Sequence, residues 1–191
     1  MKTIYFTRHG ETVWNVENKI CGAVDSPLTD KGRMQARALA ERIRSADLGI
    51  DEILYSPLSR ASETAQIISE QTGMPARKEL RLMEQNFGRW EGTPRDGKDF
   101  ARDKENFINS FGTGESNLRV AQRIYNLLDD IGREEGDQTY LLVAHNGIAR
   151  MVKSYFDDMT NEEFAKFGIH NCELLKFVYP DRQTRKEESD D

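Results

Sequence analysis

Residues 4–12 read IYFTRHGET and place a short apolar run directly before two cationic side chains and a glycine. Residues 4–6 are continuously apolar rather than alternating, which is typical of a strand buried on both faces of a parallel sheet. The other predicted strands cover residues 51–55, 138–144 and 173–179. The opening stretch therefore predicts a buried strand that is followed at once by Arg8 and His9.

Amphipathic stretches of helical length separate the predicted strands. The expected helices cover residues 29–46, 56–71, 118–131 and 147–156. Thr29 is a suitable N-cap for the first, with Met34, Leu39 and Ile43 roughly on one face, and Gly73 ends the second. Strands that alternate with helices favour an α/β fold with a mainly parallel sheet.

The composition limits the classes of protein to which the chain can belong. Its 191 residues, 37% of them hydrophobic, are enough for a core without disulfides or metals. The 27 Lys and Arg against 33 Asp and Glu give a net charge of −6, which disfavours non-specific nucleic-acid binding. The sequence contains neither a signal-peptide core nor an apolar run near the roughly 18 residues of a membrane span. We therefore expect no nucleic-acid or membrane partner.

The cysteine content points to a reducing compartment. The two cysteines, Cys21 and Cys172, are far apart in the sequence and lie outside any CxxC motif. A disulfide scaffold and a cysteine zinc site are therefore excluded as the basis of the fold. We expect a cytoplasmic protein.

Two regions interrupt the alternation of strands and helices. Residues 84–116 contain five glycines, and we expect them to form an irregular cap insertion over one end of the sheet. Residues 181–191 contain eight charged residues and no apolar one, which is typical of a disordered tail. Residues 1–180 are expected to form a single domain.

Chemically active side chains follow three of the predicted strands. Arg8 and His9 follow the first strand, Arg60 comes shortly after the second, and His145 follows the third. Ligands of open α/β sheets bind beyond the carboxyl ends of the strands, so these side chains should cluster if the three strands are neighbours. Guanidinium and imidazole groups suit the oxygens of phosphate, and Asn15 could add a neutral donor.

A histidine in such a cluster can be more than a ligand-binding group. A neutral imidazole nitrogen can attack phosphorus to form a phosphohistidine, which divides one displacement into two easier ones. The leaving oxygen then needs a proton, and Glu11, Glu84 and Glu91 are candidates of the right type. Spacing alone does not choose among the three.

Five segments, in order along the chain, resemble the phosphoglycerate-mutase-like group of the histidine phosphatase superfamily. They are RHGET with WN (residues 8–15), the G…DSPLT…G segment (22–32), SPLSRA with ETA (56–65), LME with GRWEG (82–92) and VAH (143–145). The resemblance covers about residues 3–179. It implies a three-layer α/β/α sandwich with a mainly parallel central sheet.

The resemblance also implies a role for each matching residue. His9 is the expected nucleophile, and Arg8, Arg60 and His145 are expected to hold the phosphoryl oxygens. Glu84 matches the proton donor of the family, so the resemblance implies that it is the general acid and base. Neither a metal nor a cofactor is expected for this chemistry. The residues expected to contact the substrate are Asn15, Cys21, Gly22 and Asn146.

Departures from the mutase pattern favour a phosphatase. Gln85 and Asn86 follow Glu84 where mutases have an arginine for the substrate carboxylate, and Cys21 replaces a hydroxyl residue. Asn146 stands where most relatives have a glycine after the second histidine. We therefore predict a metal-independent phosphoric monoester hydrolase of the histidine acid phosphatase type, acting on a small phosphorylated metabolite. A cofactor-dependent phosphoglycerate mutase and a non-catalytic phosphate- or phosphoprotein-binding module are the alternatives.

Overall fold

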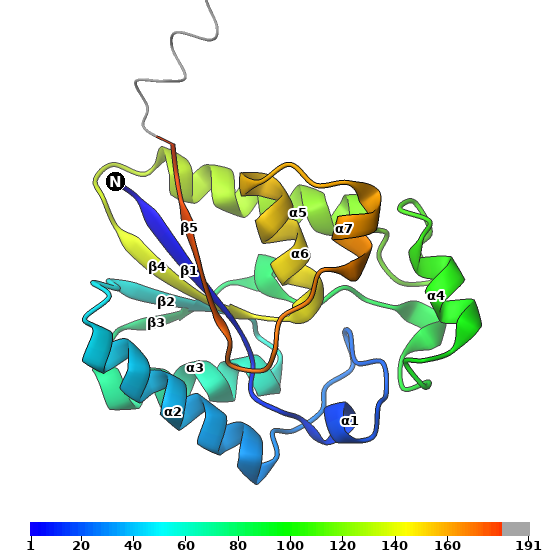
Figure 1. The fold of residues 1–191 in the computed structure, drawn as a ribbon, viewed down its shortest axis with the longest axis horizontal. Helices are drawn as coiled ribbons and strands as arrows, with labels where there is room; N and C mark the ends of the chain where they lie inside the picture. The colour runs from blue at the N-terminus through cyan, green and yellow to red at the C-terminus, as the bar shows by residue number, and fades with distance from the viewer. Residues whose placement is uncertain (181–191) are drawn as a thin grey trace, which may run out of the picture.

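The computed structural model of the chain describes residues 1–180, and a five-stranded sheet in the order β3-β2-β4-β1-β5 forms its centre (Figure 1). The strands are β1 (Thr3–Arg8), β2 (Glu52–Tyr55), β3 (Ala76–Lys78), β4 (Thr139–Ala144) and β5 (Leu174–Val178). All neighbouring pairs are parallel except β1 and β5, which are antiparallel. The predicted mainly parallel sheet is therefore confirmed.

The register of the three central strands brings their carboxyl ends to one edge of the sheet. Arg8 at the end of β1 lies opposite Ala144 at the end of β4, and Tyr55 at the end of β2 lies opposite Val143. The residues that follow these strands therefore leave the sheet side by side. This confirms that the three predicted strands are neighbours.

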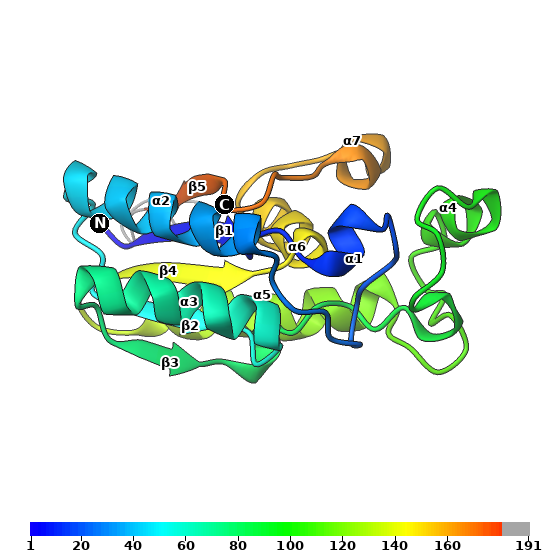
Figure 2. The same ribbon diagram turned by 90° about the horizontal axis from the view of Figure 1, so that it is seen from below.

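Helices cover both faces of the sheet, as Figures 1 and 2 show. One face packs against α2 (Asp30–Ala46) and α3 (Ser59–Thr72), and the other against α5 (Asn117–Arg133) and α6 (Asn146–Phe156). Successive side chains of β4 alternate between the two cores, so Leu141 packs with α2 and α3 while Leu142 packs with α5 and α6. Each such buried leucine contributes about 1.5–3 kcal/mol. The predicted three-layer sandwich is confirmed.

Local signals explain most of the helix ends. Thr29 caps α2 by accepting a hydrogen bond from the Gly32 N–H at 3.0 Å, and Gly73, with φ of 76°, ends α3 in the left-handed region. The predicted start of α3 is wrong by three residues. Its first residue is Ser59 rather than Ser56, because the Ser56 N–H donates to Val143 O at 3.0 Å and so extends the sheet hydrogen bonding.

The residues from 84 to 116 extend beyond the carboxyl edge of the sheet (Figure 1). They carry one turn of 3-10 helix, η2 (Gly88–Trp90), and the short α4 (Lys98–Lys104), and η1 (Leu80–Leu82) precedes them. Phe87 packs edge-on against the buried Phe100, with ring centroids 5.5 Å apart, which gives this segment an apolar contact of its own.

Two further short helices, α1 (Val13–Val16) and α7 (Asn161–Lys166), flank the same edge of the sheet. None of the helices within residues 1–180 combines the length and the apolar character needed to cross a membrane. Residues 181–191, for which the sequence predicts a disordered tail, lie outside the described residues.

Candidate active site

Two histidines meet at the carboxyl edge of the sheet. His9 follows β1 and His145 follows β4, and their ring centroids are 5.2 Å apart. The backbone N–H of His9 donates to the backbone carbonyl oxygen of Ala144 at 3.0 Å, so a hydrogen bond joins the ends of β1 and β4. The two side chains are only 4% and 0% exposed, respectively. The pairing predicted from the sequence is therefore present, in a desolvated site.

The hydrogen bond of His9 determines which ring nitrogen faces the site. Its Nδ1 lies 2.7 Å from the Gly10 carbonyl oxygen, and because a carbonyl can only accept, Nδ1 carries the proton. The lone pair is then on Nε2. Burial, followed by the charges of Arg60 and Arg8, holds the pKa of His9 well below its usual range. His9 is therefore a neutral imidazole with a free nucleophilic nitrogen.

His145 is held in the other tautomer. Its Nε2 lies 2.7 Å from Ser56 Oγ, which also accepts a hydrogen bond from the Leu58 N–H at 3.4 Å. The fully buried serine hydroxyl finds an acceptor for its own proton only if it donates to Nε2. The proton of His145 is then on Nδ1. Burial, together with Arg60 and His9, also holds the pKa of His145 well below its usual range.

Three buried side-chain nitrogens within residues 1–180 lack a hydrogen-bond partner, and all three belong to this cluster. They are Arg8 Nε, Arg60 Nε and His145 Nδ1. A buried donor without a partner costs about 1–3 kcal/mol, and an oxyanion is the acceptor that guanidinium and imidazole N–H groups favour. Burial, followed by the charge of the neighbouring Arg95, lowers the pKa of Arg8 to about 10, which disfavours its charged form while no anion is bound. The site is therefore suited to an anion.

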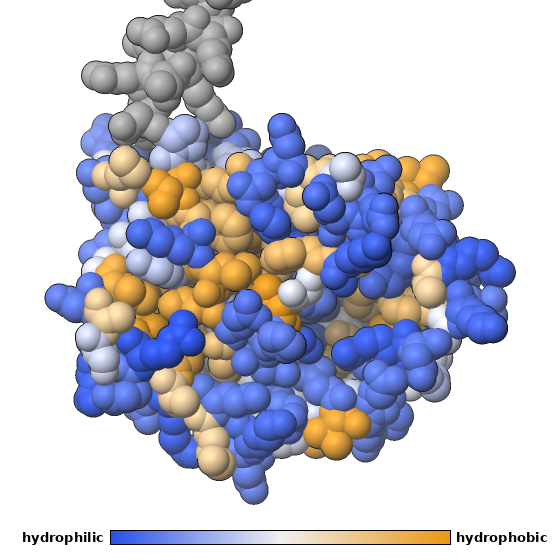
Figure 3. All heavy atoms as spheres, in the orientation of Figure 1, coloured by the Kyte–Doolittle hydropathy of each residue, from blue (hydrophilic) through white to orange (hydrophobic). Residues whose placement is uncertain are grey.

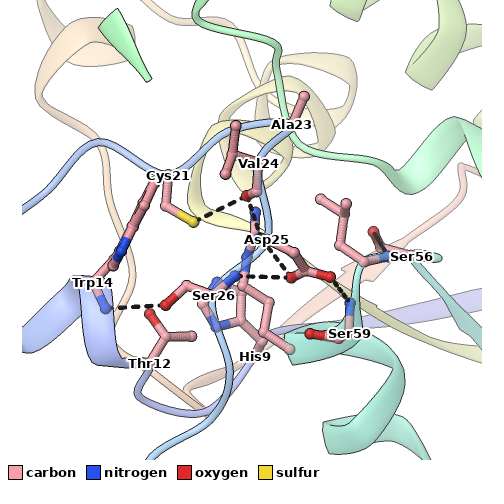
Figure 4. Close-up of polar contacts among 12 residues, drawn as sticks. His9, Thr12, Trp14, Cys21, Ala23, Val24, Asp25, Ser26, Ser56 and Ser59 are labelled. Atoms are coloured by element: carbon pink, nitrogen blue, oxygen red, sulfur yellow. Dashed lines mark hydrogen bonds and ion pairs between the residues drawn. The ribbon is translucent and has the colours of Figure 1, made fainter. Parts of the chain in front are cut away.

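A loop of residues 21–26 lies against Arg60, whose side chain is 1% exposed. Arg60 Nη1 donates to Asp25 Oδ1 at 3.1 Å and Nη2 donates to Gly22 O at 2.7 Å. Figure 4 shows Asp25 reaching from this loop to the Ser59 N–H, which donates to Oδ2 at 2.6 Å. These bonds fix the guanidinium in its orientation and leave Nε free.

A cavity of about 100 Å³ opens beside His9. Figure 3 shows a hollow between the segment that carries α4 and the rest of the molecule, with mostly hydrophilic side chains around it. Three residues predicted for the site are buried and do not line this cavity: Arg60, His145 and Gly22. Of the residues predicted from the sequence, those that line it are Arg8, His9, Asn15, Cys21, Glu84 and Asn146.

The three candidate carboxylates differ sharply in their surroundings. Glu84 lines the cavity, is 6% exposed and accepts from the Gly147 N–H at 3.0 Å. A Cβ at Gly147 would collide with this carboxylate, so the approach requires glycine. Glu11 instead pairs with Lys31 at 2.8 Å, and Glu91 accepts hydrogen bonds from three backbone N–H groups of neighbouring loops. The geometry favours Glu84 for proton transfer.

The polar residues expected to contact substrate also have structural contacts. Asn15 Oδ1 accepts from the Thr12 N–H at 3.1 Å, and Asn146 Oδ1 accepts from the Ile169 N–H at 2.9 Å. Sequence reasoning missed Asn171, whose Nδ2 donates to His9 O at 2.8 Å. The Cys21 thiol donates to Val24 O at 3.2 Å (Figure 4), and burial raises its pKa to about 11.

Three cationic residues of the cavity wall were also missed. They are Arg95, Lys104 and Arg150. The first two lie in the irregular segment and the third lies inside α6, so neither a strand end nor a motif marks them in the sequence. Among residues 1–180, no three His, Cys, Asp or Glu side chains converge as a metal-binding group.

We expect the free energy of unfolding to fall as the pH is lowered from 6.5 to 5.5. Because the pKa values of His9 and His145 are depressed, the unfolded chain takes up protons in this range that the folded chain does not. Each histidine then removes up to about 1.4 kcal/mol per pH unit. Urea unfolding at the two pH values measures the difference. His9→Asn and His145→Asn should each reduce it, and an equal difference in all three proteins would contradict the prediction.

Comparison with known proteins extends these observations. The model of the histidine phosphatase superfamily (branch 1) matches residues 4–191. Probable phosphoglycerate mutase GpmB of Yersinia pestis (strain Pestoides F) is 31% identical over 186 residues, which cover 94% of this chain and 86% of that protein.

Two solved structures are similar over most of their length. Bacillus stearothermophilus YhfR is 31% identical with a TM-score of 0.80, covering 92% of this chain and 90% of that one. Mycobacterial glucosyl-3-phosphoglycerate phosphatase, in complex with VO3, is 27% identical with a TM-score of 0.80, again covering 92% and 90%.

Proposed function

Because the chain belongs to the histidine phosphatase superfamily, we propose that it is a phosphomonoesterase that hydrolyses a small phosphorylated metabolite without a metal. One observation carries the proposal: Arg8, Arg60 and His145, which lie close to the neutral His9, each have a buried nitrogen without a hydrogen-bond partner. Three hydrogen-bond donors can stabilise the negative charge on the oxygens of a phosphoryl group, and His9 can attack its phosphorus. A relative named as a phosphatase forms a complex with VO3, an oxyanion, which supports the same reading.

The first half of the reaction forms a phosphohistidine. The lone pair of His9 Nε2 makes a bond to phosphorus while the ester P–O bond breaks. The departing alkoxide takes its proton from Glu84, which lines the cavity. Arg8, Arg60 and His145 donate to the phosphoryl oxygens and stabilise the charge of the transition state.

The second half returns the enzyme to its starting state. Glu84, now a carboxylate, removes a proton from a water molecule that attacks phosphorus. The P–N bond breaks and its electron pair returns to His9 Nε2, so inorganic phosphate leaves and Glu84 is protonated again. The hydrogen bond from His9 Nδ1 to Gly10 O persists through both halves and keeps the ring in place.

The surrounding residues complete this assignment. We propose that residues 84–116 form the cap of a single domain of residues 1–180, and that Asn15, Cys21, Gly22 and Asn146 contact the substrate. We also propose a reducing cytoplasm as the compartment, because both Cys21 and Cys172 are free thiols.

A phosphoglycerate mutase is the second candidate, because the chain is 31% identical to a protein named as a probable one. A mutase would transfer the phosphoryl group from His9 to a hydroxyl group of the substrate, whereas a phosphatase transfers it to water. Phosphorus NMR of 3-phosphoglycerate with a bisphosphorylated primer distinguishes the two: 2-phosphoglycerate identifies the mutase, and inorganic phosphate identifies the phosphatase.

Hydrolysis of p-nitrophenyl phosphate by EDTA-treated protein tests the proposal directly. We expect turnover that survives EDTA, because the proposed donors and nucleophile are all side chains of the protein. Activity that is lost to EDTA and restored by a divalent cation would contradict the metal-independent mechanism. Phosphate binding without turnover of any phosphomonoester in a substrate panel would favour a binding module.

Ser56→Ala should lower kcat/KM by about 10- to 100-fold, because His145 Nδ1 is then no longer held in its protonated form. Ser56 is a positioning residue here, since it acts through His145. The inhibition constant of inorganic phosphate should rise in parallel, an effect that a loss of packing alone would not produce. Ser59→Ala, at an exposed side chain, is the control. Unchanged phosphate affinity in Ser56→Ala would remove the assigned role.

A further inference from the structure

Three cationic side chains in the cavity wall have no part in the phosphoryl transfer proposed above. None of the three forms an ion pair with a carboxylate of residues 1–180. Arg150 Nε donates to Phe167 O at 2.6 Å and Arg95 Nη2 donates to Lys19 O at 3.0 Å. Lys104 Nζ lies over the Phe100 ring, 5.5 Å from its centroid. Within residues 1–180, no ion pair therefore neutralises their positive charge.

The positive charge in the cavity exceeds what one phosphate ester can neutralise. Arg8, Arg95, Lys104 and Arg150 line a space of about 100 Å³ together with a single carboxylate, Glu84. A phosphomonoester dianion offsets two of these cations. Once Glu84 carries the proton that it donates, two positive charges remain without an anion.

Burial is the main cause that disfavours the charged forms of these side chains, and repulsion by a neighbouring cation adds to it at Lys104. Burial and the charge of Arg150 lower the pKa of Lys104 to about 8, and burial also lowers the pKa of Arg150. Like charges that share one small cavity repel one another more strongly than they would in water, so the arrangement is unfavourable without a further anion. The cations lie on two separate elements, the 84–116 segment and α6, and both elements contribute to the wall of the cavity.

We propose that the site takes a phosphorylated substrate with a second anionic group, a carboxylate or a second phosphate, held by Arg95, Lys104 and Arg150. The proposal rests on the proposed function for the identity of the first group. Gln85 and Asn86, which directly follow Glu84, supply no cation, so recognition of the second group comes from other parts of the chain. The small cavity favours a short skeleton between the two groups.

Phosphonates test this inference by binding alone, because their C–P bond is not an ester and is not hydrolysed. Calorimetry at pH 7 compares propylphosphonate, with a neutral tail, with 3-phosphonopropionate and propane-1,3-bisphosphonate. We expect the two ligands with anionic tails to bind at least about 10-fold more tightly. The stronger of the two identifies the second group as carboxylate or phosphate.

Substitutions assign the preference to the cavity wall. Lys104→Met and Arg95→Met should each lower the ratio of anionic-tail to neutral-tail affinity several-fold. Lys98→Met is the matched control for Lys104→Met, because both lysines belong to α4 and Lys98 does not line the cavity. Circular dichroism confirms that each variant is folded, and Lys104→Gln serves if the methionine variant is not.

Equal affinities for the three phosphonates, or a preference that survives both substitutions, would overturn the second-anion site. Turnover decides the proposed function separately. A protein that hydrolyses no phosphomonoester yet keeps the preference retains the site and is not a phosphatase. A protein that hydrolyses p-nitrophenyl phosphate but shows no preference is a phosphatase without this site.

Discussion

His9→Ala should lower kcat/KM by at least about 10⁴-fold and leave no covalent phosphoenzyme. The neutral Nε2 is the group that attacks phosphorus in the proposed mechanism, and alanine offers no replacement. Arg8, Arg60 and His145 keep their donors in the variant, so inorganic phosphate should still bind. The expected result is therefore a protein that binds an oxyanion without turning over.

Rapid quenching with a ³²P-labelled substrate measures the intermediate. A phosphohistidine has a P–N bond, which survives alkaline denaturation and is hydrolysed in acid, whereas a phosphoserine behaves oppositely. The label should appear in the active protein quenched in base and be absent from His9→Ala. His170→Ala, at the exposed third histidine, should label as the unmodified protein does. Label retained in His9→Ala would show that another residue is the nucleophile.

The cluster of His9 and His145 could be predicted because two simple physical rules act on it. Continuous apolar runs indicate strands buried on both faces, and parallel strands end at a common edge. Short, strongly apolar strands such as those around Phe6 and Leu142 leave little ambiguity about their burial, and both residues are fully buried. Residues that directly follow such strands are therefore placed together by the sheet itself.

Features without a hydrophobic pattern could not be predicted in this way. The edge strand β3 consists of three exposed residues, so no apolar signal marks it. Met34 was expected on the buried face of α2 but is 65% exposed, because the buried positions of that helix follow Ala36, Leu39 and Ile43 instead. The cations Lys104 and Arg150 likewise reach the cavity only through tertiary packing.

Residue spacing left three candidate carboxylates, the family resemblance implied Glu84, and the tertiary structure supplies a physical reason for that choice. Glu11 and Glu91 have the same chemistry, but Glu11 pairs with Lys31, Glu91 accepts from three backbone N–H groups, and neither lines the cavity. Sequence reasoning had no way to see these contacts. The assignment therefore leads to a prediction that separates proton transfer from a structural role.

Glu84→Gln should lower kcat for an alkyl phosphate by about 10²–10⁴-fold, because the poor alkoxide leaving group needs the proton that glutamine cannot give. With p-nitrophenyl phosphate the phenolate leaves without protonation, so the first half of the reaction should remain fast. Hydrolysis of the phosphohistidine then becomes slow, since water has lost its base. Stopped-flow measurement should show a burst of about one nitrophenolate per enzyme, followed by slow turnover.

Glu91→Gln separates this effect from a disturbance of the loops. Both substitutions remove one carboxylate oxygen as an acceptor of backbone N–H groups, at a cost of about 1–3 kcal/mol. Only Glu84, however, lines the cavity that contains His9. Glu91→Gln should therefore affect both substrates alike and show no burst. Equal losses on the two substrates in Glu84→Gln, again without a burst, would mean that its carboxyl group supports the loops and that the leaving alcohol takes its proton from elsewhere.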